Sequence, residues 1–193
     1  MAYVSRGFIP QTSLASNLGF TRPMYIPAGN GTATALYDIV KVSTSGSTVD
    51  TAGVPAGLEG CVRITGVDDV PVGVIVGFIA DPDYLSQTYR SASTARVALV
   101  CYDPQVVLEV QEDNASAGSL AVARLGTPVD VVVGSVDTTT GTSGMQISSA
   151  ALTGSPGMFR LQQRSFAVDN AEIAGTNTKW LVTFNTHQFK ATA

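Results

Sequence analysis

The sequence contains one histidine, His187, so a hydrolase site of the Ser-His-Asp or Cys-His type would depend on it. The available thiol nucleophiles are Cys61 and Cys101. Neither has a neighbouring charge in sequence that would lower its pKa, although Asp103 lies close to Cys101. A lone histidine at the end of a strand is typical of a polar edge residue. The sequence therefore predicts no catalytic residues.

Carboxylates form three close pairs that could bind calcium or act as general acid and base. The pairs are Asp81 and Asp83, Asp68 and Asp69, and Glu112 and Asp113. All three fall at expected turns, where aspartate is favoured for backbone hydrogen bonding, and no third ligand is spaced to complete a metal cage. The glycine-rich stretches at 29–35 and 141–144 lack a phosphate-loop lysine and a dinucleotide fingerprint. No metal site and no cofactor is predicted.

Length and charge indicate one domain in an assembly. A chain of 193 residues can bury one sizeable core and is short for two. Charged residues make up 13%, against about 25% in typical soluble domains. Such a surface suits a protein held in an assembly, although a monomer with a neutral polar surface remains an alternative. The net charge is −4 with no Lys/Arg cluster, which argues against direct nucleic-acid contact.

The cysteines and the apolar segments indicate the cellular compartment. Cys61 and Cys101 stand in apolar contexts without CxxC spacing, so we expect core thiols rather than a disulfide. The first twenty residues contain no sustained apolar stretch of the signal-peptide type. The most apolar segment, 72–80, is too short to span a membrane. We expect synthesis in a cytoplasm and no membrane partner.

The strongest structural pattern is a pair of apolar runs, 97–102 and 106–110, separated by Asp103 and Pro104. β-branched residues dominate both runs, and Asp-Pro is typical of a turn. The pattern predicts two strands in a hairpin at the centre of a sheet. The first should be covered on both faces, and the second should have one buried and one mostly wet face.

Shorter runs of the same kind predict further strands along the chain. They lie at 36–42, 61–67, 72–80, 129–136, 145–149, 158–164 and 178–184. Residues 115–126 are the best helical candidate, about two turns at most. The total of roughly eight to ten short strands without βα alternation predicts an all-β protein, a single β-sandwich or β-barrel domain with at most one short helix.

The first 31 residues differ from the rest. They carry three prolines among Ser, Thr, Asn and Gly, with isolated large apolar residues and no periodicity. We interpret residues 1–31 as an extended arm and 32–193 as the β domain. The arm would lie in a groove on its own domain or on a neighbour. A first strand followed by an irregular loop is the alternative.

Three segments carry a resemblance to known proteins. They are VALVCYDPQVVLEVQEDN (97–114), VDVVVGSVDTTTGTSGMQISSAAL (129–152) and FRLQQRSFAVDNAEIAGTNTKWLVTFNTHQFK (159–190). In this order they resemble head-decoration or cement proteins of tailed bacteriophages. The resemblance covers about residues 36–190 and implies a compact β-rich protein on the outside of an icosahedral head, often a dimer or trimer. It carries no catalytic residues, and the arm is not part of it.

Together these observations predict a structural virion protein, made in the bacterial host cytoplasm and located on the capsid exterior, that binds the phage major capsid protein and itself as a homodimer or homotrimer. We expect Tyr3, Phe8, Phe20 and Tyr25 of the arm to be partner-binding residues, because aromatics dominate protein contacts. Deleting residues 1–29 would then leave a folded domain that no longer attaches. The alternatives are a head fibre or vertex or tail protein, and a small hydrolase using Asp81, Asp83 or His187.

Overall fold

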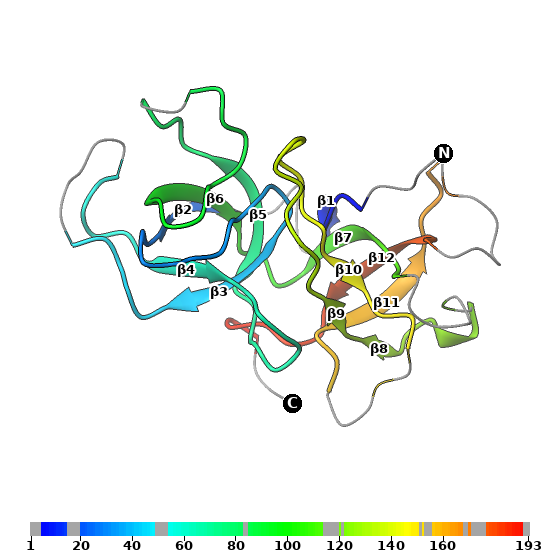
Figure 1. Cartoon of the computed structure of the whole chain (residues 1–193). Helices are drawn as coiled ribbons and strands as arrows, with labels where there is room; N and C mark the ends of the chain where they lie inside the picture. The colour runs from blue at the N-terminus through cyan, green and yellow to red at the C-terminus, as the bar shows by residue number, and fades with distance from the viewer. Residues whose placement is uncertain are drawn as a thin grey trace.

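The computed structural model describes residues 5–14, 20–48, 54–82, 85–113, 120, 122–150, 152, 156–167, 170 and 177–190. In these residues the protein is all-β, as predicted. The strands form two lobes that lie side by side, a closed barrel and a five-stranded sheet with a small second sheet (Figure 1). In the described residues the protein contains a single helical element, the 3₁₀ turn η1 (Val122–Arg124). This turn lies within the segment predicted to be helical.

The first lobe is a barrel of five short strands in the order β2-β4-β3-β5-β6. They are β2 (Thr21–Ile26), β3 (Ile39–Ser43), β4 (Gly60–Arg63), β5 (Gly73–Phe78) and β6 (Arg96–Cys101). The barrel closes through β2, which pairs antiparallel with β6 along its whole length and parallel with β4 at Tyr25. Its interior is a cluster of apolar side chains that includes Met24, Val40 and Ile75.

The second lobe is an antiparallel sheet in the order β1-β7-β12-β11-β8. Its strands are β1 (Ile9–Ser13), β7 (Val106–Gln111), β12 (Lys179–Phe184), β11 (Phe159–Arg164) and β8 (Pro128–Val129). A two-stranded sheet of β9 (Val131–Val132) and β10 (Gln146–Ile147) lies beside it. Trp180, Val182 and Phe184 share one face of β12 and are fully buried in the core.

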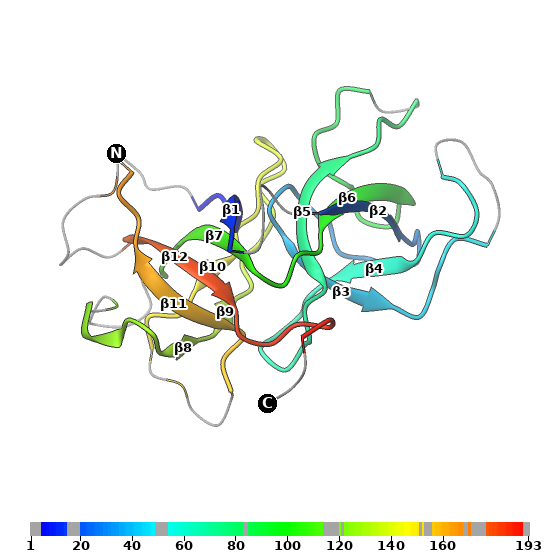
Figure 2. The same cartoon turned by 180° about the vertical axis from the view of Figure 1, so that it is seen from behind.

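The strands predicted at 97–102 and 106–110 exist as β6 and β7, but the predicted hairpin is wrong. The turn between them forms as expected, with Val106 N–H donating to Asp103 O (3.2 Å). Both edges of β6 are occupied by β2 and β5, and both edges of β7 by β1 and β12, so neither has an edge left for the other. The chain crosses here from barrel to sheet (Figure 2). The face of β7 predicted to be wet is also buried at Val107 and Gln111, each 6% exposed.

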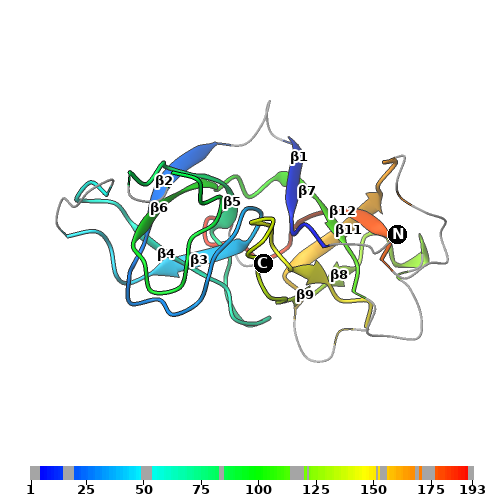
Figure 3. The same cartoon turned by 45° about the horizontal axis from the view of Figure 1, so that its top comes forward.

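The described part of the N-terminal segment differs from the predicted arm, because it supplies one strand to each lobe (Figure 3). β1 pairs with β7, and β2 closes the barrel. Gly7 permits this entry: its φ is +76°, and a Cβ there would lie 2.5 Å from the Ser143 Cβ. Deleting residues 1–29 would therefore remove two strands, and we now expect that truncation to prevent folding.

The two lobes share one apolar core. The larger apolar cluster includes Leu108, Trp180 and Phe184 of the sheet together with Ile39 and Val74 of the barrel. Phe8 lies in this cluster, and its ring stacks on Phe159 at a centroid distance of 4.5 Å. Burial of this much shared apolar surface is the main term holding the lobes together.

Candidate interaction surface

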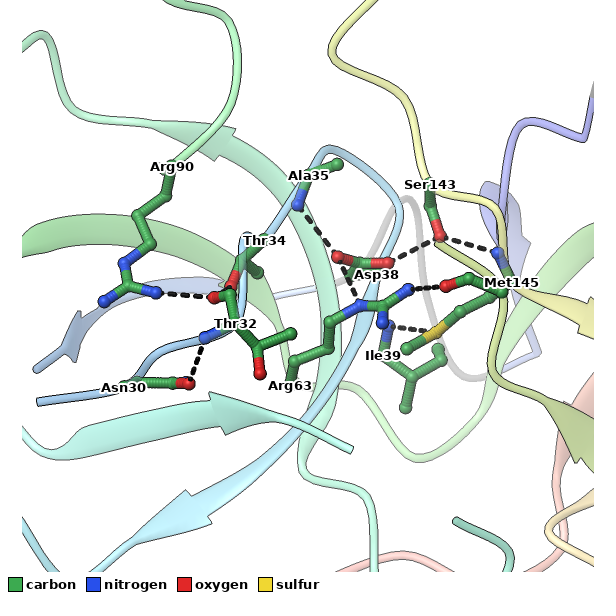
Figure 4. A network of polar contacts seen from close by, with 11 residues as sticks. Asn30, Thr32, Thr34, Ala35, Asp38, Ile39, Arg63, Arg90, Ser143 and Met145 are labelled. Atoms are coloured by element: carbon green, nitrogen blue, oxygen red, sulfur yellow. Dashed lines mark hydrogen bonds and ion pairs between the residues drawn. The ribbon is translucent and has the colours of Figure 1, made fainter. Parts of the chain in front are cut away.

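A buried polar network joins the lobes beneath the surface (Figure 4). Asp38, directly before β3, accepts hydrogen bonds from Ala35 N (2.8 Å) and Ser143 Oγ (2.6 Å). Arg63, the last residue of β4, forms an ion pair with the same carboxylate at 2.9 Å. Its other end donates to Gly134 O of the sheet lobe at 2.5 Å. The carboxylate of Asp38 and the guanidinium of Arg63 therefore connect the barrel to the sheet lobe.

The electrostatics of this network are those of a structural joint. Burial raises the pKa of the Asp38 carboxyl above its ordinary value, while the Arg63 guanidinium and the Ser143 hydroxyl act in the opposite direction. The Asp38 side chain is completely buried and that of Arg63 is 6% exposed. Substrate therefore has no access to either group, and their role is to fix the orientation of the two lobes.

On the surface at the same junction lies a group that we call the aromatic cluster: Phe20, Arg22, Tyr102 and Phe189. The ring of Tyr102, after β6, lies 6.3 Å from that of Phe20 and 6.2 Å from that of Phe189. The Arg22 guanidinium of β2 lies 5.0 Å from the Tyr102 ring and 5.3 Å from the Phe189 ring. The ends of the barrel strands β2 and β6 and the segment after β12 thus contribute to one surface feature.

The aromatic cluster is exposed. It contains the positive charge of Arg22, and the negative charge of Glu59 lies beside it. Phe20 is 63% exposed and Phe189 51%. Arg22 forms an ion pair with Glu59 at 2.7 Å, and both side chains remain partly accessible. Exposed rings of this kind mark contact sites, because apolar surface that is removed from water by a partner stabilises the complex. The arrangement suits protein binding.

His187 supports this surface from below. It is 4% exposed, and its ring contacts Phe184 and Phe189 at centroid distances of 5.0 and 5.8 Å. Its Nδ1 accepts a hydrogen bond from Phe189 N (3.1 Å). Burial lowers the pKa of His187 from 6.5 to about 4, so the ring is neutral near pH 7. His187 positions the segment that carries Phe189.

The four residues predicted to bind a partner have different outcomes. Phe8 is fully buried in the core, so its assignment as a partner anchor is wrong: its ring packs on Phe159. Phe20 is exposed and belongs to the aromatic cluster. Tyr25 is half-buried in β2, where its backbone N donates to Glu59 O (2.8 Å). Tyr3 lies outside the described residues.

The rival hydrolase residues are not brought together as far as the structure describes them. His187 lies against the start of β5, next to Val72, whereas Asp81 follows the other end of that strand. Asp83 lies outside the described residues. Both cysteines are buried and free, and burial raises the pKa of Cys61 to about 12 and that of Cys101 in the same direction. These are thiols of the core, not activated nucleophiles.

The carboxylate pairs serve the backbone. Asp69 accepts hydrogen bonds from Thr65 N (2.6 Å) and Gly66 N (3.3 Å), which is the predicted turn chemistry. Glu112 instead is buried, and its carboxylate accepts hydrogen bonds from Leu120 N (2.7 Å) and Trp180 Nε1 (3.3 Å). Within the described ranges, no group of three or more His, Cys, Asp or Glu side chains could hold a metal ion.

Sequence reasoning missed the Asp38–Arg63 pair and most of the aromatic cluster. One signal for Arg63 was available. Arg63 lies two residues after Cys61 and so on the same face of an apolar strand, where a charged side chain needs a buried partner. No local pattern could connect Phe20, Tyr102 and Phe189, which are separated by more than eighty residues at each step. Their proximity depends on the pairing of β2 with β6 and on the return of the chain to the barrel after β12.

No protein-family model matches the chain, and no curated protein matches it. The helical part of the described structure is too short and too polar to cross a membrane.

Proposed function

We propose that this protein is a structural virion protein of a tailed bacteriophage: a capsid decoration or cement protein that binds the outer surface of the head across joints between coat subunits. Its partners are the phage major capsid protein and further copies of the same chain. It is made in the host cytoplasm and acts on the capsid exterior. Its contribution is binding energy and not catalysis.

The observation that carries the proposal is the exposed aromatic cluster at the junction of two lobes that share a core. A protein that binds the assembled shell and not free coat subunits stabilises the shell by mass action. Such binding needs a rigid surface with aromatic anchors, because rigid rings lose little conformational entropy on contact. The low content of charged residues, 13%, and the resemblance of residues 36–190 to head-decoration proteins also support the proposal.

The experiment is reconstitution on heads that lack this protein. Purified protein is added to such heads, and we measure co-sedimentation and the temperature at which the heads release their DNA. We expect saturable binding at a fixed ratio to the coat protein and a higher release temperature. Absence of binding, or binding without any rise in release temperature, would contradict the cement role.

The same experiment separates the hydrolase alternative. Asp81→Asn leaves a fully assembled fold and should bind and stabilise heads as the unmodified protein does. If the protein were a hydrolase, its binding to heads would not be linked to a rise in head stability. Its activity would instead depend on the Asp81 carboxylate. Loss of head stabilisation in Asp81→Asn with intact binding would count against a purely structural function.

A further inference from the structure

The chain returns from the sheet lobe to the barrel in residues 187–190, which we call the clasp. Gln188 N of the clasp donates to Pro71 O (2.9 Å), just before β5 of the barrel. The clasp also holds Phe189 in the aromatic cluster. We propose that the clasp is an acid-sensitive latch: a proton added to His187 releases the clasp and withdraws Phe189 from the cluster. The latch is a property of the isolated chain, and its effect on attachment to heads rests on the proposed function.

The latch follows from the hydrogen bond that His187 makes inside the clasp. The backbone N–H of Phe189 donates to His187 Nδ1 at 3.1 Å. A ring nitrogen that accepts a hydrogen bond uses its lone pair, so the neutral ring carries its single proton on Nε2. Protonation of the imidazole then occurs at Nδ1 and converts this acceptor into a donor. Two N–H groups face one another, and the bond that holds Phe189 is lost.

The surroundings of the ring oppose its charged form. His187 is 4% exposed, and its ring lies 5.0 Å from that of Phe184 and 5.8 Å from that of Phe189. Burial lowers the pKa of His187 from 6.5 to about 4, and the Lys190 ammonium acts in the same direction. Opening of the clasp brings the ring into water, where its pKa returns toward 6.5. The proton therefore binds more tightly to the open clasp than to the closed one.

Charged groups near the ring come from three segments of the chain. Lys190 of the clasp places a positive charge beside His187. Asp103, after β6, favours the imidazolium, but its carboxylate already accepts a hydrogen bond from Gln105 N (2.8 Å). Arg22 of β2 places a second positive charge 5.3 Å from the aromatic ring of the clasp. Two cations and one anion that is engaged elsewhere favour opening of the clasp over an imidazolium inside it.

The direction of the pH dependence follows from the two pKa values of His187. Above pH 6.5 the ring is neutral in both forms, and the clasp stays closed. As pH falls from 6.5 to about 4, the open form takes up the proton first, so the closed form loses stability relative to it. Below about pH 4 both forms are protonated, and their ratio no longer changes. Over the whole range the ratio of open to closed clasp rises by roughly two orders of magnitude.

The first test observes His187 directly, because it is the only histidine of the chain. Nuclear magnetic resonance of the isotope-labelled full chain reports the tautomer of this ring and its pKa without any ambiguity of assignment. We expect a neutral ring with its proton on Nε2 at pH 7 and a titration midpoint well below 6.5. A proton on Nδ1 at pH 7, or a midpoint at 6.5 or above, would overturn the proposal.

Hydrogen exchange then follows the clasp over the same pH range. Corrected for the intrinsic pH dependence of exchange, the protection of the amides of residues 188–190 should fall by roughly two orders of magnitude. The backbone pair of Thr34 and Arg90 in the barrel (2.9 and 2.7 Å) is the control and should keep its protection. The fluorescence of Trp180, the only tryptophan, checks that the sheet lobe stays folded. An equal loss of protection at the control pair would mean general unfolding and would contradict a local latch.

The variant that separates titration from packing is His187→Asn. Its Oδ1 can replace Nδ1 as the acceptor for Phe189 N, but the amide does not titrate. The clasp of this variant should keep its protection from pH 6.5 down to 4. His187→Ala removes the acceptor and should leave the clasp poorly protected at every pH. If the clasp of His187→Asn opened with acid as the unmodified clasp does, another group would be responsible and the proposal would fail.

Decorated heads test what the latch does to attachment. We expect acid to release the unmodified protein between pH 6.5 and 4, and His187→Asn to stay bound over this range. Equal release of the two proteins, with a clasp that opens only in the unmodified one, would overturn the link between the clasp and attachment. If the unmodified protein does not bind heads at pH 7, the proposed function fails, and the measurements on the isolated chain still decide whether the latch exists.

Discussion

The barrel and the sheet lobe each hold loops with a fully buried charged side chain, and the two charges are of opposite sign. In the barrel, Arg90 is fully buried, and its guanidinium donates to the carbonyls of Pro27 (2.8 Å), Thr32 (2.6 Å) and Thr94 (2.7 Å). In the sheet lobe, the Glu112 carboxylate accepts from the N–H groups of Leu120 and Trp180. The buried cation Arg90 thus satisfies loop carbonyls of the barrel, and the buried carboxylate of Glu112 satisfies the backbone N–H of Leu120 and the indole N–H of Trp180.

A second pair of residues repeats this difference. Arg96 of the barrel donates to Gln87 O (2.9 Å) and Tyr89 O (2.5 Å), and its guanidinium lies over the Phe78 ring. Asp113 of the sheet lobe accepts from Ser149 N (2.8 Å) and Ser149 Oγ (2.6 Å). The junction uses one group of each kind, Arg63 and Asp38. Buried charge in this protein therefore holds backbone in place and joins the lobes.

The largest effect is expected at the junction. Asp38→Ala leaves Arg63 buried without its anion and should lower the free energy of unfolding by about 3–5 kcal/mol. Urea denaturation followed by tryptophan fluorescence measures the change. The double variant Asp38→Ala with Arg63→Met removes both charges and should recover much of the loss. A single variant as stable as the unmodified protein would show that the pair does not join the lobes.

A somewhat smaller and local effect is expected in the barrel. Arg90→Met keeps much of the side-chain volume but leaves three carbonyls without their donor, which should cost about 2–3 kcal/mol. Hydrogen exchange should rise first in residues 27–34 and 85–95, the segments that Arg90 joins. An equal rise in the strands of the sheet lobe would contradict a role confined to the barrel.

The corresponding change in the sheet lobe should be smaller and pH-dependent. Glu112→Gln keeps a neutral acceptor for Leu120 and Trp180 but replaces the carboxyl group with an amide, at a cost of about 0.5–1.5 kcal/mol near pH 4.5. Burial raises the pKa of Glu112 above 4.5, so its contribution is full below that pH and is lost as pH rises through the folded-state pKa.

Urea denaturation at several pH values tests this sign. The stability of the unmodified protein relative to Glu112→Gln should decrease from pH 4.5 upward, because only the carboxyl can lose a proton. The Arg90→Met effect should stay constant over the same range, since a guanidinium remains charged there. A pH dependence of opposite sign at Glu112 would show that its neighbours stabilise the anion more than burial opposes it.

The smallest effect belongs to an exposed pair. Lys41 and Asp69 form an ion pair with side chains 31% and 17% exposed. Lys41→Ala should change the free energy of unfolding by less than about 1 kcal/mol, because solvent screens such pairs. High salt should remove most of what remains. A loss as large as that of Asp38→Ala would remove the distinction between buried and surface charge.

Local patterns predicted the strands well and their partners poorly. The apolar runs at 97–102 and 106–110 became β6 and β7 because β-branched residues fit an extended backbone wherever it pairs. Pairing depends on which edges are already occupied, and that is a property of the whole chain. The same limit explains the N-terminal segment: strand β1 carries Pro10 and a register shift, so its sequence shows no alternation.

Of the residues in the aromatic cluster, only Phe20 was predicted from the sequence to bind a partner. The sequence predicted aromatic residues of the N-terminal segment as partner anchors, and it could not tell a buried ring such as Phe8 from an exposed one such as Phe20. Tyr102 lies beside Phe20 because β2 pairs with β6, and Phe189 joins them because the chain returns to the barrel after β12. Tertiary contacts, not local propensity, build this surface.

The most direct test of the central claim is the copy number of this chain relative to the major coat protein in purified particles, by quantitative mass spectrometry. A cement protein that tiles the shell predicts a ratio of about one or a simple fraction such as one third, set by the symmetry of the head. A ratio of a few per cent would place the protein at a vertex or in the tail, and its absence from particles would contradict a structural role in the virion.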